Sequence, residues 1–301
     1  MNTPLTPSPA SPRNLVVTYH YVRPENSDGV TGVSPREFRE HLRLIKSRYR
    51  PVTAYEFVAF HREESGMALV TFDDALADQH DYAFPILEDE GVPAVFYAPM
   101  LPYSNHADRW CTQHLLHALG HELGWAPLEK RINPVVEPLL LEAGKRVDEA
   151  EMNRLYHYEA PHKRRLKYIL AFALDAEQAG AALRNVNKSV GLSPDDWYMS
   201  ATELLELQDA GHSLGGHGFS HVPFTTLTTK QQAAEMHRSQ TLMSQLFGAM
   251  SRTLAYPFGR ASRETEAIAK AAGYTHMFTT ENRVDAKFLE KAIAAPAAAA
   301  A

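Results

Sequence analysis

The sequence predicts an α/β fold in which a parallel sheet or barrel is covered by helices. Short apolar or β-branched runs alternate along the chain with amphipathic segments, several of which end at a glycine that can cap a helix: Gly91, Gly211 and Gly273. Strands that alternate with helices form parallel sheets, because each helix carries the chain back to the start of the next strand. One long stretch, 104–197, breaks the alternation and predicts a helical insertion.

The expected elements are assigned in chain order from these patterns. Strands are predicted at 15–22, 67–73, 92–98, 212–217, 252–256 and 275–280, with a further short one near 50–53. Helices are predicted between them at 35–48, 78–90, 200–210, 229–247 and 261–272. We therefore expect a single domain over 15–285 that contains the insertion.

The two ends of the chain differ in composition from the rest. Residues 1–14, MNTPLTPSPASPRN, are rich in Pro, Ser and Thr and lack an apolar core, which predicts a disordered leader and not a signal peptide. Residues 286–301 finish in a run of alanines, and we interpret them as a low-complexity tail.

The overall composition is typical of an ordinary globular enzyme. The 301 residues are 45% hydrophobic and 22% charged. A net charge of −6 and a pI of about 6.2 give no reason to expect a nucleic-acid surface. No apolar run approaches the roughly 20 residues that span a bilayer. A single cysteine, Cys111, excludes an internal disulfide and favours the cytoplasm. The insertion could form an interface, so an oligomer is possible.

Polar side chains gather at the ends of the predicted strands. Asp73 and Asp74 close the run MALVTFD, His217 and His221 follow the strand at 212–217, and His20 closes the first strand. The carboxyl ends of parallel strands converge on one face, so these side chains are expected to meet. Two imidazoles and one carboxylate suit zinc and leave positions for water and substrate. A second, non-ligating carboxylate could then take a proton, which is the arrangement of a metal-dependent hydrolase.

The same residue types also occur in purely structural roles. An Asp-Asp pair after a strand is more often a capping or turn motif when it stands alone. A second group of histidines, His114, His117 and His121, has similar spacing on a predicted helix of the insertion. No predicted strand end lies near that group, and we interpret it as a surface helix face.

The combination of motifs resembles a known family. TFDD (71–74), HGFSH (217–221) and AYPFG (255–259), with TYHYV near the start, resemble the polysaccharide deacetylases of the carbohydrate esterase type that share the NodB homology domain. The resemblance covers most of 15–280. It implies a distorted (β/α)7-type barrel, a divalent metal, usually zinc, and removal of an N- or O-acetyl group from a sugar or polysaccharide precursor.

The same resemblance suggests a subgroup. The insertion and the stretch DDWYMSATELLELQDAGH look most similar to members linked to bacterial surface-polysaccharide biosynthesis, of the O-antigen or lipopolysaccharide kind.

The family's functional residues carry over onto matching positions. Asp73 matches the catalytic base, which takes a proton from a metal-bound water as that water attacks the acetyl carbonyl. Asp74, His217 and His221 match the metal ligands. The third motif lines the acetyl pocket and supplies a backbone N–H for the oxyanion. The expected substrate-binding residues are His20, Tyr256, Pro257 and Phe258.

The chain departs from the family pattern in two places. Ala255 stands where many members have an arginine that braces the catalytic aspartate. The late histidine that acts as general acid has no clear counterpart, because His276 lies inside a strand pattern and is expected to be packed. The acid could lie in the tail, be replaced by His20, or be missing.

These departures keep two alternatives open. The chain could be an inactive deacetylase-like protein that binds metal or carbohydrate, or a hydrolase of another small amide such as a formyl-sugar.

Overall fold

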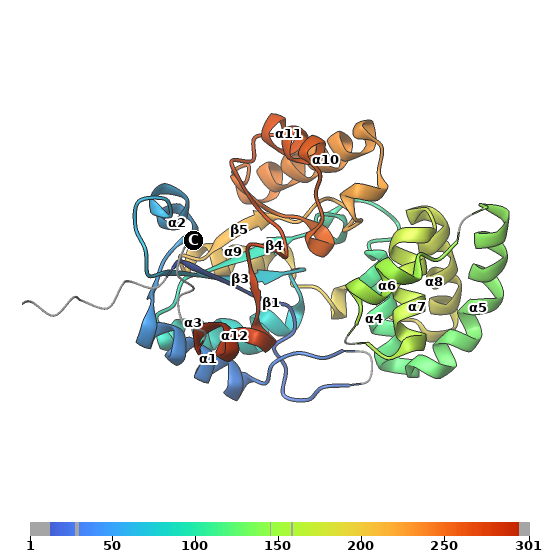
Figure 1. Cartoon of the computed structure of the whole chain (residues 1–301), viewed down its shortest axis with the longest axis horizontal. Helices are drawn as coiled ribbons and strands as arrows, with labels where there is room; N and C mark the ends of the chain where they lie inside the picture. Colours follow the sequence, from blue (N-terminus) through green and yellow to red (C-terminus); the bar gives the residue numbers. More distant parts are fainter. Residues whose placement is uncertain (1–12, 28–29, 145, 158, 295–301) are drawn as a thin grey trace, which may run out of the picture.

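The computed structural model describes residues 13–294, apart from 28–29, 145 and 158. One parallel sheet, curled into an open and distorted barrel, forms the centre of the fold (Figure 1). The strand order is β7-β6-β5-β4-β3-β1-β8, and β2 pairs with the start of β3. The predicted barrel-type α/β fold is confirmed. Residues 1–12 of the expected leader and 295–301 of the expected tail lie outside the described residues.

Most strands of the described chain lie where the apolar runs predict them. They are β1 (Leu15–Tyr19), β2 (Arg50–Pro51), β3 (Met67–Asp73), β4 (Ala94–Ala98), β5 (Ser213–Gly216), β6 (Thr253–Ala255) and β7 (His276–Phe278). The sequence does not predict β8 (Val284–Asp285), which pairs with β1 and is too short to give an apolar pattern. Every residue of β1, β3 and β4 is buried, as expected for parallel strands covered on both faces.

Helices between the strands cover the outside of the barrel. They are α1 (Pro35–Arg48), α2 (Ala54–Phe60), α3 (Phe84–Glu90), α9 (Ala201–Asp209), α10 (Thr229–Phe247) and α11 (Arg263–Ala271). A π-helical turn, Gln79–Ala83, leads into α3. Capping boxes begin α1 at Ser34 and α10 at Thr228, so the sequence itself fixes these starts. The short α2 was not predicted.

A last short helix packs onto the barrel core. Helix α12 (Leu289–Ala294) lies beyond the expected domain boundary at residue 285. Leu289 and Ile293 are buried in the same apolar cluster as Phe38 and Leu42 of α1. The packed part of the chain therefore includes residues that composition alone assigned to a tail.

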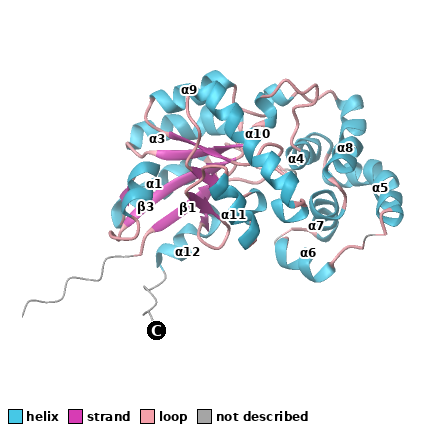
Figure 2. Cartoon of the chain, turned by 90° about the horizontal axis from the view of Figure 1, so that it is seen from above, coloured by secondary structure: helices cyan, strands magenta, loops and turns pink. Residues whose placement is uncertain are grey.

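The stretch between β4 and α9 forms a separate helical layer beside the barrel. It contains α4 (Thr112–Leu123), α5 (Trp125–Glu142), α6 (Glu149–Leu155), α7 (Pro161–Tyr168) and α8 (Ala176–Val190). These helices share their own core, which includes Trp125, Leu128 and Leu183. Figures 1 and 2 both place this helical insertion to one side of the sheet. No helix in the described part of the chain is long and apolar enough to cross a membrane.

Candidate active site

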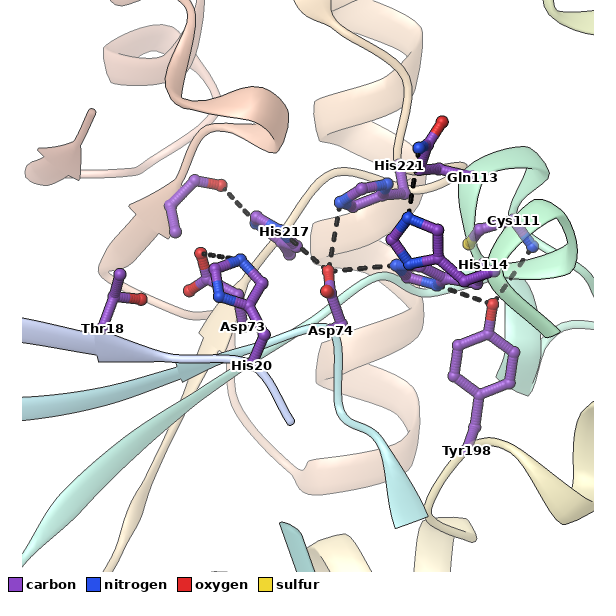
Figure 3. Close-up of polar contacts among 12 residues, drawn as sticks. Thr18, His20, Asp73, Asp74, Cys111, Gln113, His114, Tyr198, His217 and His221 are labelled. Carbon is purple, nitrogen blue, oxygen red and sulfur yellow. Dashed lines mark hydrogen bonds and ion pairs between the residues drawn. The ribbon is translucent and has the colours of Figure 1, made fainter. Parts of the chain in front are cut away.

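The carboxyl ends of four strands bring the predicted residues to one edge of the barrel. His20 follows β1, Asp73 ends β3, His217 follows β5 and Tyr256 follows β6. The side chains of His20, Asp73, Asp74, His217 and His221 lie close together there, with His114 beside them (Figure 3). Strand direction brings the barrel residues together, because all these strands are parallel.

The turn after β3 separates the two aspartates. Asp74 has a φ of 83° and Ala75 a φ of 54°, in the left-handed region that costs a non-glycine residue about 1–3 kcal/mol. Hydrogen bonds hold this turn: the Asp74 N–H donates to the Tyr97 carbonyl at 2.9 Å, and the Met199 N–H donates to the Ala75 carbonyl at 3.0 Å. The two neighbouring carboxylates therefore face different partners.

Asp74 is the centre of a group of imidazoles. Its Oδ1 lies 3.3 Å from His217 Nε2 and 3.1 Å from His221 Nε2. Asp74, His217 and His221 offer ligand atoms that all lie within 4.8 Å of one another. Asp74 Oδ1 is buried and has no aligned hydrogen bond among the described residues, although it is surrounded by ring nitrogens. A buried carboxylate and convergent imidazoles without such bonds fit a divalent cation.

The hydrogen bond and charges around these residues favour ligation. His217 Nδ1 lies 2.7 Å from the Ala255 carbonyl, which can only accept, so Nδ1 carries the proton and Nε2 faces Asp74. Burial lowers the pKa of His221 to about 4, which keeps this imidazole neutral near pH 7. Burial would raise the pKa of Asp74, but His114 and His221 outweigh it and hold this pKa well below its usual range.

The pKa of His217 is shifted in the opposite direction to that of His221. Burial lowers its pKa, but the carboxylates of Asp73 and Asp74 outweigh burial and raise this pKa above the ordinary value. A cation that binds Nε2 must therefore compete with a proton at acid pH.

Asp73 has a different partner, which the sequence did not reveal. Arg283 donates from Nη1 to Oδ1 at 2.7 Å and from Nη2 to Oδ2 at 2.8 Å, and both side chains are buried. Burial alone would raise the pKa of Asp73, but Arg283 and then His217 outweigh it and lower this pKa. Arg283 thus provides the brace that Ala255 cannot provide. No local pattern links the two residues, which are 210 positions apart.

The interpretation of His114 as part of a surface helix face is wrong. His114 is 1% exposed, and its Nε2 lies 3.2 Å from Asp74 Oδ1. It lies on α4 of the insertion, whose first turn packs against the turn after β3. Helical spacing correctly identifies the helix, but it does not say which of its faces meets the barrel.

The remaining predicted residues divide into two groups. His20 is exposed, with Nε2 3.8 Å from Asp73 Oδ2, and the Phe258 ring lies 5.2 Å from the His221 ring. Pro257 is buried beside Phe258. The ring of Tyr256 does not join the site, because it packs against Phe224 in an apolar cluster under α10 and α11.

His276 lies away from this edge of the barrel. It is the first residue of β7, and its ring contacts His61 at 5.3 Å. It therefore lies in a strand, as expected, and away from the carboxyl ends, but its side chain is half-buried and not fully packed.

Comparisons with known proteins identify related sequence and fold. Residues 174–277 match the family model described as polysaccharide deacetylase. YxkH of Bacillus subtilis (strain 168), a curated relative that carries the name of a polysaccharide deacetylase, is 30% identical over 101 residues. That alignment covers 34% of this chain and 35% of the relative, so it spans about a third of the relative's length.

Solved structures share the fold over most of the chain. IcaB from Ammonifex degensii covers 94% of this chain and 96% of its own, with a TM-score of 0.56 and 17% identity. The Streptococcus pyogenes deacetylase PplD, solved in complex with acetate, covers 89% of this chain and 82% of its own, with a TM-score of 0.52 and 15% identity. At these identities the likeness concerns the fold alone.

Proposed function

We propose that this chain is a divalent-metal-dependent hydrolase that removes an acyl group, most simply acetyl, from a sugar or polysaccharide precursor. Its likeness to the polysaccharide deacetylases, in the fold and in the sequence of residues 174–277, supports the proposal. The observation that carries the proposal is the division between two adjacent carboxylates. Asp74 faces imidazoles, whereas Asp73 is paired with Arg283 and stays outside the set of ligand atoms.

Asp73 is the proposed base. Arg283 lowers its pKa, so its carboxylate is ionised at neutral pH and can accept a proton from the attacking water. Asp74, His217 and His221 would hold the cation, for which zinc is the simplest choice with two imidazoles and one carboxylate. When bound, the cation would polarise the acyl carbonyl and lower the pKa of a water at the site.

The other residues act on the acyl and leaving groups. The backbone N–H of Phe258 is proposed to stabilise the oxyanion, with Pro257 and the Phe258 ring beside the acyl group. Collapse of the tetrahedral intermediate breaks the C–N or C–O bond. His20, exposed and close to Asp73, is proposed to contact the substrate and give its proton to the leaving amine or alcohol. The products are the deacylated sugar unit, with a free amine or hydroxyl, and the carboxylic acid.

Replacement of the base provides the test. Asp73→Asn keeps the side-chain volume but removes the proton acceptor, so we expect kcat for acetate release from N-acetylated oligosaccharides to fall by about 100-fold or more. Zinc content, measured by elemental analysis, should stay at the wild-type level, because Asp73 is not a proposed ligand. Asp209→Asn, an exposed change outside both groups of possible metal ligands, serves as the matched control. Wild-type turnover in the Asp73→Asn protein would contradict the assignment.

The Arg283 contact also bears on the alternatives. It supports catalysis over a role limited to binding, because the missing family arginine was one of two reasons to doubt activity. Two narrower versions of the proposal specify more of the substrate. In one the acyl group is formyl, and in the other the sugar is a precursor in surface-polysaccharide biosynthesis. The cytoplasm stays the proposed compartment on the evidence of one buried cysteine, Cys111.

A further inference from the structure

His114 reaches the proposed metal ligand from outside the barrel. It lies in the first turn of α4, in the helical insertion, yet its Nε2 is as close to Asp74 Oδ1 as are those of the two histidines that follow β5. Three imidazole nitrogens thus surround one carboxylate oxygen at 3.1–3.3 Å. Among the described residues, Asp74, His217 and His221 form one of two groups of mutually close ligand atoms, and His114 is in neither.

A chain of hydrogen bonds fixes the protonation of the His114 ring. The Cys111 N–H donates to Tyr198 Oη at 3.2 Å, and Tyr198 Oη lies 2.8 Å from His114 Nδ1 (Figure 3). The buried hydroxyl needs an acceptor for its own hydrogen. The Cys111 sulfur is also near, but sulfur accepts far more weakly than an imidazole nitrogen. Tyr198 therefore donates to Nδ1, which leaves the ring proton on Nε2, facing Asp74.

We propose that His114 is a positioning residue that donates a hydrogen bond from Nε2 to Asp74 and so orients this carboxylate toward the cation. The proposal rests on the proposed function, in which Asp74 is a ligand. One oxygen cannot align with three nitrogens at once. When His217 and His221 turn their lone pairs to a cation, His114 is the imidazole that remains to bond the carboxylate.

The need for such a donor follows from the turn that carries Asp74. The residue is held in the left-handed region, and the hydrogen bonds of that turn described above join backbone groups, so they do not act on the carboxylate itself. The segment that carries Tyr198 is paired with the same turn, through the Leu76–Tyr198 bridge and the Met199 N–H to Ala75 carbonyl bond. The hydrogen-bonded chain of Cys111, Tyr198 and His114 is therefore held in place relative to the turn that carries Asp74.

Metal affinity tests the role separately from turnover. We would measure the Kd of the purified apo protein for Zn²⁺ by competition with a chromophoric chelator, and record the Co²⁺ absorption spectrum at saturation. His114→Ala should weaken Zn²⁺ binding by about 10–100-fold. His114→Gln retains an N–H donor and should stay within a few-fold of the wild type. Tyr198→Phe removes the donor to Nδ1 and should give an intermediate loss.

Controls separate this result from misfolding and from direct ligation. His121→Ala changes a histidine on the same helix that contacts Ser27, and should bind Zn²⁺ like the wild type. Thermal melts in EDTA check that each variant folds. At saturating Co²⁺ the His114→Ala spectrum should match the wild type, because the ligands are unchanged.

Three results would overturn the proposal. Wild-type Zn²⁺ affinity in His114→Ala would show that His114 does not position Asp74. Wild-type Zn²⁺ affinity in Tyr198→Phe would show that Tyr198 does not fix the His114 ring. A changed Co²⁺ spectrum in His114→Ala, together with equally weak Zn²⁺ binding in His114→Gln and His114→Ala, would show that His114 is itself a ligand. A wild-type protein that binds no divalent metal would instead refute the proposed function itself.

Discussion

Arg283 is the residue that most favours the charged form of Asp73. Its guanidinium bonds both carboxylate oxygens, and its charge opposes the effect of burial on the Asp73 pKa. Replacing Arg283 with Gln should raise that pKa, because the neutral amide no longer stabilises the charged carboxylate. Activity should then be lost at a higher pH as the solution is acidified.

The pH profile of kcat/KM measures this change. We expect its acid limb to move to higher pH in Arg283→Gln. The move should be smaller in Arg283→Lys, which retains the charge without the bidentate geometry. An acid limb at the wild-type pH in Arg283→Gln would show that Asp73 is not the group that limits activity there.

Strand β5 shows how tightly the sheet is packed below the site. A Cβ on Gly215 would lie 2.2 Å from the ring of Tyr97 on the paired strand β4. Gly215→Ala should therefore destabilise the protein by about 1–3 kcal/mol through overpacking. Chemical denaturation gives this value.

A second glycine separates steric overlap from backbone strain. Gly191, after α8, has a φ of 83° and open space around its Cβ position. Gly191→Ala should cost only about 1–2 kcal/mol of left-handed strain. Equal stability of Gly215→Ala and the wild type would mean that Tyr97 moves away freely.

The elements that the sequence predicts are those with a long periodic pattern. Strands such as β3 and helices such as α1 and α10 have apolar runs or capping boxes that identify them locally. Helix α2 and strand β8 are too short for a period, and they form because neighbouring elements provide pairing or burial. Their existence depends on tertiary packing.

The candidate site likewise contains residues that the sequence predicts and residues that only the folded structure reveals. The proposed metal-ligand pattern can be predicted because His217 and His221 are close in sequence and Asp74 directly follows a strong strand. Arg283 and His114 were missed because their contacts arise only when the barrel curls and the insertion packs against it. Such contacts have no signature in a single sequence.

Asp78 should make the stability of the whole molecule depend on pH. This carboxyl is buried, with Arg23 Nε 3.8 Å away, and burial raises its pKa to about 7. In the unfolded chain its pKa should be about 3.9. Between these values the folded protein holds a proton that the unfolded chain has released, so the free energy of unfolding should fall as pH rises from about 4 to 7.

The comparison of Asp78→Asn with the wild type isolates this effect. Asn stays neutral, so its free energy of unfolding relative to the wild type should increase from pH 4 to pH 7, as measured by urea denaturation. The exposed Asp209→Asn, which does not contribute to the raised pKa of Asp78, should leave the pH dependence unchanged. A difference between Asp78→Asn and the wild type that is constant with pH would contradict the raised pKa.

The helical insertion leaves the barrel after β4 and returns through α9 to β5, the strand that pairs with β4. Helix α9 alone could make this crossover, so no strand pairing requires helices α4 to α8. An ancestor could have gained or lost the whole block without any repair to the sheet. If His114 positions Asp74, such a loss would leave the strand pairing intact but weaken the cation site. It would also uncover Tyr21 and Leu76, which are buried against the insertion, so selection on both catalysis and folding would keep the block in place.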